Sequence, residues 1–395
     1  MSEALLPAFT IARLPEIRFG AGRLAELPDL VAGYGERVLL VTGASSLTQG
    51  GYWEPLVAGL AARGICWRQV TIAGEPSPAM VDRAVAGYRA WRPAVVVGIG
   101  GGSVLDGAKA IAGLLPGGAS VLDHLEVVGR GIPYHGPSLP LVAVPTTAGT
   151  GSEATKNAVL SEHGQHGYKR SFRHDLLMAR VAIIDPELLH SLPHSLMAAQ
   201  GMDAFTQLLE SYLSTAANPF TDALNLSGLE AFQRGFFAAL EGDGEGCAWL
   251  AYAALLSGIG LAHTGLGVVH GLASPLGALF PIPHGVVCGT LVAAATALNI
   301  RALEARLPKD RALLRYAEVG RLLTGCTGDD VHARAALVER LTAWQQQLAI
   351  PRLGEYGMTH AEIPAVVAQS RGSSMRTNPL PLHDAELAAL LAERL

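Results

Sequence analysis

Short hydrophobic runs alternate with amphipathic segments along the first half of the chain. Runs rich in β-branched residues occur at 37–42, 67–72, 94–99, 141–145 and 181–185, with the spacing of strands that are separated by helices. Most of these runs are apolar throughout, which is typical of strands covered on both faces. The pattern predicts a mostly parallel, Rossmann-like sheet with helices on each side.

The pattern changes after Asp185 and Pro186. No convincing strand follows, and helical periodicity continues from about residue 195 to the C-terminus, with breaks at 218–219, 242–246, 281–285 and 351–357. We therefore predict an α/β domain over residues 1–190 and an all-helical domain over residues 191–395. A chain of 395 residues agrees with two domains, because one core rarely grows this large.

Two apolar stretches of the helical half, residues 248–262 and 285–300, raise the question of a membrane. Both are shorter than the about 20 residues of a spanning helix. Both are rich in Ala and Gly, and three histidines lie between or beside them. We interpret them as buried helices and expect no membrane partner.

Composition narrows the class of protein further. Hydrophobic residues make up 50% of the chain and charged residues 16%, which is enough to form a large core. The net charge of −5 and the absence of a Lys/Arg run give no indication of a nucleic-acid partner. The four cysteines show no C-x-x-C pair, and no signal peptide is apparent at the N-terminus. These features predict a cytoplasmic protein.

Two polar turns follow predicted strands. The first is a run of Gly100, Gly101, Gly102 and Ser103, and the second contains Thr146, Thr147 and Thr150. Glycine lets backbone N–H groups approach a ligand closely, and the helix after the first turn presents its N-terminus to a pyrophosphate. The first turn differs from G-x-G-x-x-G, since Ser103 stands at the third glycine position, so a tight turn without a ligand is an alternative.

The helical half contains residues of the metal-binding type. Asp203 and Gln207 are four residues apart and share one face of a predicted helix, whereas His270 and His284 follow later. Imidazole and carboxylate ligands suit Zn(II) or Fe(II) better than Mg²⁺. Spacing alone also allows core histidines and a helix-capping aspartate.

Taken together, these motifs resemble the iron-containing (group III) alcohol dehydrogenase family over nearly the whole chain. The motifs are GGGS at 100–103 with Asp106, PTTAGTGSE at 145–153, Lys169, IIDP at 183–186, GMDA at 201–204, GLGVVHG at 265–271, PIPHG at 281–285 and TNP at 377–379. The resemblance implies a dehydroquinate synthase-like fold, in which a dinucleotide-binding domain precedes a helical metal and substrate domain. It also implies homodimers or larger homo-oligomers.

The resemblance implies hydride transfer between a nicotinamide and a small alcohol or aldehyde, with a divalent metal as Lewis acid. The dinucleotide is expected along the two polar turns, with Asp106 and Lys169 nearby. The implied metal ligands are Asp203, Gln207, His270 and His284.

The chain departs from the family pattern at three positions. Gln207 stands where the family usually has His, which defines an atypical subgroup with an amide at one ligand position. Ser274 stands where a His usually serves a proton relay, so we expect its hydroxyl to act there. His263 replaces a frequent Asn, and we include it among the expected catalytic residues.

The turn after the first predicted strand bears on the cofactor. Many NAD-using members have an Asp there, which repels a 2′-phosphate, whereas this chain has Gly43, with Ser45 nearby. We therefore expect NADP(H) to be favoured over NAD(H).

Three alternatives stay open. One is a metal-independent reductase of the maleylacetate-reductase type, for which Lys169, Arg170 and Arg173 are the few cationic candidates. Another is a non-catalytic dinucleotide-binding protein. A third is a carbocycle-forming or glycerol-phosphate enzyme of related fold, whose markers differ from those above.

Overall fold

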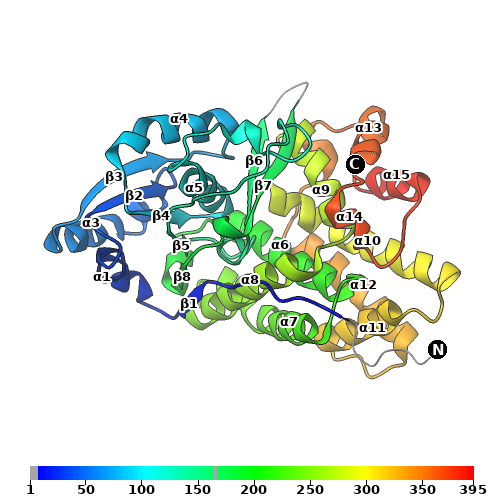
Figure 1. Ribbon diagram of the computed structural model, residues 1–395. Helices are drawn as coiled ribbons and strands as arrows, with labels where there is room; N and C mark the ends of the chain where they lie inside the picture. The colour runs from blue at the N-terminus through cyan, green and yellow to red at the C-terminus, as the bar shows by residue number, and fades with distance from the viewer. Residues whose placement is uncertain (1–7, 163–166) are drawn as a thin grey trace.

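The computed structural model describes residues 8–162 and 167–395. Figure 1 shows a sheet flanked by helices on one side of the molecule and a bundle of helices on the other. A parallel sheet therefore precedes a helical domain, and the predicted fold class is confirmed.

The main sheet has six parallel strands in the order β1-β8-β5-β4-β2-β3. Their bounds are β1 Glu16–Phe19, β2 Arg37–Thr42, β3 Cys66–Thr71, β4 Val95–Gly100, β5 Leu141–Pro145 and β8 Val181–Ile184. The five predicted runs match β2, β3, β4, β5 and β8 to within one residue at each end. The sequence analysis missed β1, because its four residues alternate charged and apolar side chains and form no hydrophobic run.

Alternate residues of the central strands serve two separate cores. Val38 and Leu40 of β2 pack with α1 Leu27–Ala32 and α3 Trp53–Ala62 on one face. Leu39 and Val41 pack with α4 Pro78–Tyr88 and α5 Gly102–Leu114 on the other. Burial on both faces explains why the strands are apolar throughout.

The order of strands places a ligand crevice in the sheet. From β2 the chain moves outward to β3 and then returns to the other side of β2 to form β4. Such a reversal leaves an opening outside the carboxyl ends of the two inner strands, where open α/β sheets bind ligands. The first polar turn follows β4, at this edge.

A second, two-stranded antiparallel sheet consists of β6 Asn157–Glu162 and β7 Tyr168–Arg173. The sequence analysis missed this hairpin, because β7 reads YKRSFR and only Phe172 is fully buried. The hairpin extends from the sheet domain and contacts the helical domain at α9 Val268–Leu279. It therefore forms one wall of the space between the domains.

Beyond α9, the helical domain contains long central helices and shorter C-terminal ones. They are α6 His194–Leu213, α7 Pro219–Leu240, α8 Gly244–Thr264, α10 His284–Arg306, α11 Arg311–Thr324, α12 Asp330–Gln347, α13 Ile363–Gln369, α14 Ser373–Arg376 and α15 Asp384–Glu393. A further short helix, α2 Ser46–Gln49, follows β2. Two helices, α8 and α10, are long and apolar enough to cross a membrane, but most of each lies inside the protein, as predicted for residues 248–262 and 285–300.

The two domains approach each other at a pair of glycines. Gly151, in the second polar turn, has φ of 58°, and Gly258 lies on α8. A Cβ atom on Gly258 would lie 2.2 Å from the carbonyl oxygen of Gly151. Only glycine permits this backbone contact, which fixes the second turn against the helical domain.

Candidate active site

The two polar turns lie against each other at the carboxyl edge of the sheet. The N–H of Thr146 donates to the carbonyl of Gly100 at 3.0 Å. A Cβ on Gly101 would lie 3.1 Å from Thr147, and one on Gly102 would lie 2.6 Å from Thr150, so these glycines make room for the threonines. No side chain caps the N-terminus of α5, which begins at Gly102 and leaves its first N–H groups for a ligand.

A buried polar network ties α5 to the second turn. The side chain of Lys109 is fully buried, and its ammonium donates to Asp106 at 3.1 Å and to Ser152 at 2.6 Å. The second carboxylate oxygen of Asp106 accepts the N–H of Val159 at 3.0 Å. Both oxygens of Asp106 are therefore used within the protein, so this residue shapes the two turns from behind.

A hollow of about 280 Å³ lies beyond the carboxyl ends of β2 and β3. Gly43 and Ser45 line it together with Thr42, Gln69 and other residues, and the Gln69 amide donates to the Thr42 hydroxyl at 2.7 Å. None of the lining residues is Asp or Glu. This hollow has the position and polarity for the adenosine end of a dinucleotide.

Four ligand-type side chains meet in the helical domain. Asp203 of α6, His270 of α9, and His284 and Cys288 of α10 each offer one atom, and these atoms all lie within 4.8 Å of one another. The Nε2 atoms of His270 and His284 lie 3.2 and 3.6 Å from Oδ1 of Asp203. The sulfur of Cys288 lies 3.6 Å from Nε2 of His270. Helices from distant parts of the sequence thus converge on one point.

Glu210, two turns after Asp203 on α6, orients this cluster. Its carboxylate accepts a hydrogen bond from Nδ1 of His270 at 2.7 Å and from the N–H groups of Gly267 and Val269 at 2.9 and 2.7 Å. A proton held at Nδ1 leaves the lone pair of Nε2 directed at the cluster. The same carboxylate also satisfies the N-terminus of α9.

Charge in the cluster is unevenly distributed. Burial by itself raises the pKa of Asp203, but the imidazoles of His284 and His270 outweigh burial and lower this pKa to about 2. Burial lowers the pKa of His284 to about 4, against the attraction of Asp203. At neutral pH the cluster therefore contains the Asp203 carboxylate and a neutral His284 imidazole, the forms that bind metals. Against burial, Cys288 and Asp203 raise the pKa of His270 well above its usual value, and burial raises the pKa of the Cys288 thiol to about 12. Metal binding at these two residues would therefore release protons.

The donor set fits a divalent metal. Oδ2 of Asp203 and Nδ1 of His284 are buried and have no hydrogen-bond partner among the residues that the structure describes. A buried carboxylate oxygen without a partner is costly, and a cation beside it removes that cost. A carboxylate, two imidazoles and a sulfur suit Zn(II) or Fe(II) rather than Mg²⁺.

Gln207 lies beside the cluster with its amide nitrogen toward it. Nε2 of Gln207 donates to Oδ1 of Asp203 at 3.3 Å, and its Oε1 accepts the hydroxyl of Ser257 at 2.9 Å. In this orientation Gln207 donates a hydrogen bond to Asp203, one of the metal-type residues of the cluster. Coordination through Oε1 would require rotation of the amide by a half-turn, which would turn Nε2 toward Ser257.

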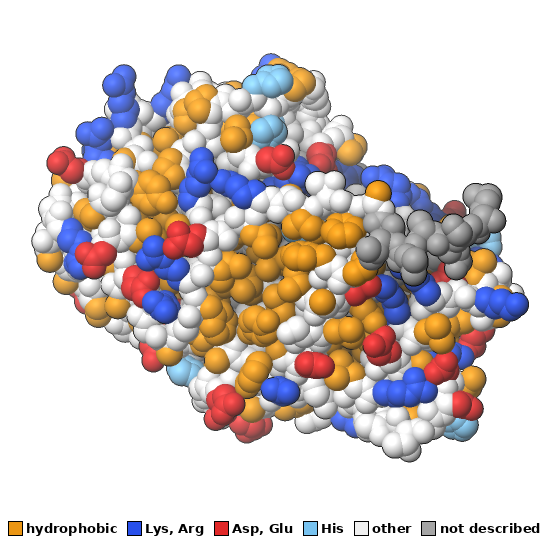
Figure 2. All heavy atoms as spheres, turned by 60° about the horizontal axis from the view of Figure 1, so that its bottom comes forward, with side chains coloured by type: hydrophobic (Ala, Val, Ile, Leu, Met, Phe, Trp, Pro, Cys, Tyr) orange, Lys and Arg blue, Asp and Glu red, His pale blue; other side chains and the backbone are white. Residues whose placement is uncertain are grey.

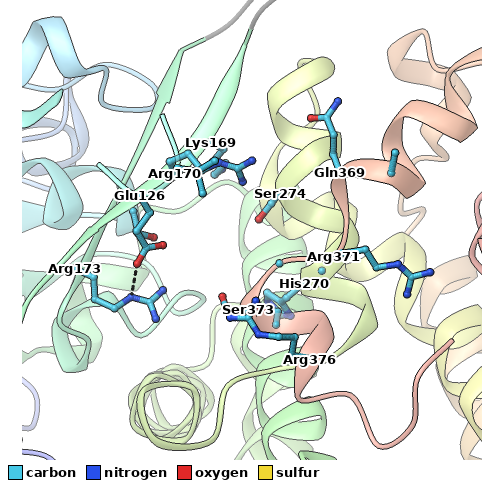
Figure 3. A pocket seen from close by; sticks show the side chains of 16 residues that line it. Glu126, Lys169, Arg170, Arg173, His270, Ser274, Gln369, Arg371, Ser373 and Arg376 are labelled. Carbon is cyan, nitrogen blue, oxygen red and sulfur yellow. Dashed lines mark ion pairs between the residues drawn. The ribbon is translucent and has the colours of Figure 1, made fainter. Parts of the chain in front are cut away.

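A cavity of about 430 Å³ opens onto the cluster, and His270 and Ser274 of α9 line it (Figure 3). Lys169 of β7 lines it from the hairpin side and forms an ion pair with Glu75. The structure therefore brings together the predicted residues His270, Ser274 and Lys169 in one cavity.

His263, which we expected among the catalytic residues, is in neither the metal-type cluster nor the lining of the cavity. Its Nδ1 donates to the carbonyl of Ile259 at 2.7 Å, and its Nε2 accepts the N–H of Ala12 at 3.1 Å. Both ring nitrogens are thus used to attach the N-terminal segment to the end of α8.

Two members of the site, Cys288 and Glu210, are not among the predicted site residues. Cys288 lies four residues after His284, a spacing that puts both side chains on one face of α10. Glu210 lies seven residues after Asp203, again on one face. The same spacing rule that linked Asp203 to Gln207 could have found both.

An open sheet with paired phosphate-type turns, facing a cluster of metal-type ligands, defines a metal-dependent, dinucleotide-linked oxidoreductase. Comparison with known proteins agrees. The family model "Iron-containing alcohol dehydrogenase" matches residues 15–186, and "Fe-containing alcohol dehydrogenase family, C-terminal" matches residues 197–395. The chain belongs to the iron-containing alcohol dehydrogenase family, whose members bind a divalent metal and a nicotinamide cofactor.

Similar proteins include alcohol dehydrogenases and an aldehyde reductase. Alcohol dehydrogenase 4 of Schizosaccharomyces pombe is 31% identical over 97% of this chain and 87% of its own length. Lactaldehyde reductase of Escherichia coli is 30% identical over 88% of this chain and 89% of its own length. The crystal structure of a 1,3-propanediol oxidoreductase superposes with a TM-score of 0.89 at 26% identity, covering 98% of this chain and all of the other. The chain is thus a metal-dependent alcohol dehydrogenase or aldehyde reductase.

Proposed function

We propose that Asp203, His270, His284 and Cys288 hold the metal. The observation that carries this assignment is the convergence of the four ligand atoms within 4.8 Å of one another. A set of four donors that includes one sulfur would favour Zn(II) within the pair Zn(II) and Fe(II), because thiolate is the softer ligand. Gln207 then orients Asp203 through its amide rather than coordinating the metal.

When bound by these residues, a metal would supply Lewis-acid chemistry at the substrate oxygen, and a nicotinamide would supply or accept the hydride. The residues of the chain provide the setting for this transfer. Glu210 keeps the proton of His270 at Nδ1, and the turns at Gly100 and Thr146 position the dinucleotide. The hydroxyl of Ser274, which lines the cavity, passes the substrate proton toward solvent.

We infer that NADP(H) is favoured over NAD(H). The hollow beyond β2 contains no carboxylate that would repel a 2′-phosphate, and the Ser45 side chain stands where it can donate to one. Lys169 and Asp106 support the cofactor indirectly, Lys169 from the cavity wall and Asp106 through the network with Lys109.

A homo-oligomer is supported by one face of the molecule. β1 is an edge strand, so one side of its backbone has no neighbour in the sheet, and Ile17 on it is 37% exposed. Figure 2 turns the β1 and α8 side of the molecule forward and shows a broad field of hydrophobic side chains. Edge strands with apolar surroundings pair readily, and a second copy is the natural occupant. Ile17→Asp should shift the protein toward monomer in light scattering.

We also propose a domain boundary and a cellular location for the protein. We place the domain boundary at residues 190–191, after the last described strand and before α6. A cytoplasmic location is supported by four cysteines that are all free.

The direct test is metal analysis of the purified protein together with turnover of aldehydes with NADPH and NADH. We expect about one metal per chain and activity that is lost on chelation and restored by Zn(II) or Fe(II). Activity that survives complete metal removal would favour the metal-independent alternative, and cofactor binding without turnover would favour a non-catalytic protein.

A further inference from the structure

The cavity above the metal cluster has a strongly cationic lining. Five of its sixteen lining residues are Lys or Arg, and one is acidic; the charged members are Lys169, Arg170 and Arg173 from β7, Arg371 and Arg376 from the C-terminal segment, and Glu126. Figure 3 shows Lys169, Arg170 and Arg173 on the left of the space, Ser274 and His270 near its middle, Arg376 below them and Arg371 on the right. The cations thus surround the space where a substrate must lie.

Three of these cations are neutralised within the protein. Lys169 pairs with Glu75, Arg173 with Glu126 at 3.4 Å, and Arg371 with Asp384. The two remaining cations of the lining are the guanidinium groups of Arg170 and Arg376.

Arg170 and Arg376 form no ion pair among the residues that the structure describes. Nε of Arg170 is buried and has no hydrogen-bond partner there either. A buried guanidinium nitrogen without an acceptor is costly, and a bound anion would remove this cost. Arg376 is exposed and lines the same cavity. The planar fork of guanidinium N–H groups also matches carboxylate, sulfonate and phosphonate oxygens.

The phosphates of the dinucleotide do not account for this lining. Residues 100–103 and 146–150, which form the phosphate-type turns, are absent from the walls of this cavity. The hollow at Gly43 and Ser45 is likewise separate from it. Arg170 and Arg376 are therefore available to an anion other than the phosphates bound at those turns.

We propose that the substrate is a small anionic aldehyde, or the corresponding alcohol, whose acidic group binds Arg170 and Arg376. This inference rests on the active site proposed above. His270 belongs both to the metal cluster and to the cavity wall, so a carbonyl oxygen at the cluster leaves the rest of the substrate in the cavity. A volume of about 430 Å³ suits a chain of a few carbons that ends in a carboxylate, sulfonate or phosphonate.

The test compares aldehydes of equal chain length that differ in charge. Succinic semialdehyde and butanal form one pair, and phosphonoacetaldehyde and sulfoacetaldehyde, each compared with propanal, separate the kinds of anion. We expect kcat/KM of the wild-type holoenzyme to be about ten- to a hundredfold higher for the anionic member. Added NaCl should reduce this advantage, because salt screens an attraction between charges.

Arg170→Gln and Arg376→Gln should each lower the ratio of anionic to neutral kcat/KM by about tenfold or more, mainly through KM. Arg170→Lys should retain part of the preference, since it keeps the charge without the fork. Arg63→Gln is the matched control, because Arg63 pairs with Asp29 at the surface of the sheet domain and does not line the cavity. This variant should keep the wild-type ratio.

The outcomes separate two failures. If wild-type enzyme reduces butanal as well as succinic semialdehyde and salt has no effect, the anionic substrate is wrong while the aldehyde reductase stands. If Arg170→Gln or Arg376→Gln raises KM for NADPH and leaves the aldehyde ratio intact, the cations serve the cofactor and the proposal is overturned. If no aldehyde is reduced at all, the active site itself is wrong, and the proposal falls with it.

Discussion

Oε2 of Glu210 lies 2.7 Å from Nδ1 of His270, whose Nε2 lies 3.2 Å from Asp203. One carboxylate thus determines which nitrogen of the imidazole is free. Carboxylates that accept from the far nitrogen of a ligating histidine fix its tautomer and raise its basicity. The contact also joins α6 to the N-terminus of α9, so the backbone and the ligand are positioned by one residue.

Replacement of Glu210 by Gln should weaken metal binding by about 10- to 100-fold, because the amide is neutral and holds the imidazole proton less firmly. Competition with a chromogenic chelator measures this affinity directly. Glu304→Gln is the control, since Glu304 pairs with Arg334 away from the site. Equal affinities of Glu210→Gln and wild type would mean that Glu210 has only a structural role at α9.

Cys288→Ser should reduce affinity for Zn(II) more than for Fe(II), because it replaces a sulfur donor by a hard oxygen. Cobalt(II) substitution offers a readout that is independent of activity. A thiolate-to-cobalt charge-transfer band is expected in wild type and should vanish in Cys288→Ser. Cys326→Ser, which lies outside the cluster, should keep the band. A wild-type spectrum without the band would favour the oxygen of Gln207 as the fourth ligand.

The fold was largely predictable because burial on both faces leaves a clear mark on the sequence. Strands such as β4 and β5 are apolar throughout, and their turns are rich in Gly and Thr. The β6–β7 hairpin leaves no such mark. Four side chains of β7, those of Lys169, Arg170, Ser171 and Arg173, line a polar cavity, and a charged segment such as residues 168–173 looks like a loop.

The site was predictable only where its parts are close in sequence or carry a motif. Asp203, His270 and His284 could be placed by spacing and resemblance. The cationic cavity could not, because Arg170 and Arg376 lie about 200 residues apart and line one cavity only through the packing of β7 and the C-terminal segment against α9. His263 lies apart from His270, because its helical spacing from that residue is lost where α8 ends at Thr264.

Glu153, at the end of the second polar turn, should make stability depend on pH. Burial raises its pKa from 4.5 to about 7. The folded protein therefore binds this proton more tightly than the unfolded chain does, and the free energy of unfolding falls as pH rises from about 4.5 to about 7. At about 1.4 kcal/mol per pKa unit, the loss is on the order of 3 kcal/mol.

Glu153→Gln keeps the shape of the protonated side chain and removes this titration. We expect the variant to match wild type near pH 4 and to be more stable above about pH 8, in urea unfolding followed by circular dichroism. All other titrating groups are shared, so their contributions cancel in the difference. Parallel curves for the two proteins across this range would show that Glu153 is ionised in the fold.

Gly43→Asp should reverse the preference for NADPH. The φ of Gly43 is not in the left-handed region, and a Cβ there would meet only Ser46 and Val104 at 3.6 and 3.9 Å, so the substitution fits without strain. The new carboxylate would face the hollow beyond β2 and repel a 2′-phosphate, while it could accept hydrogen bonds from the ribose hydroxyls of NADH. We expect kcat/KM for NADPH to fall by about tenfold or more relative to NADH.

Gly43→Ala separates charge from bulk and should leave the ratio near that of wild type. An unchanged ratio in Gly43→Asp would place the adenosine ribose elsewhere, and the argument for NADP(H) would fail.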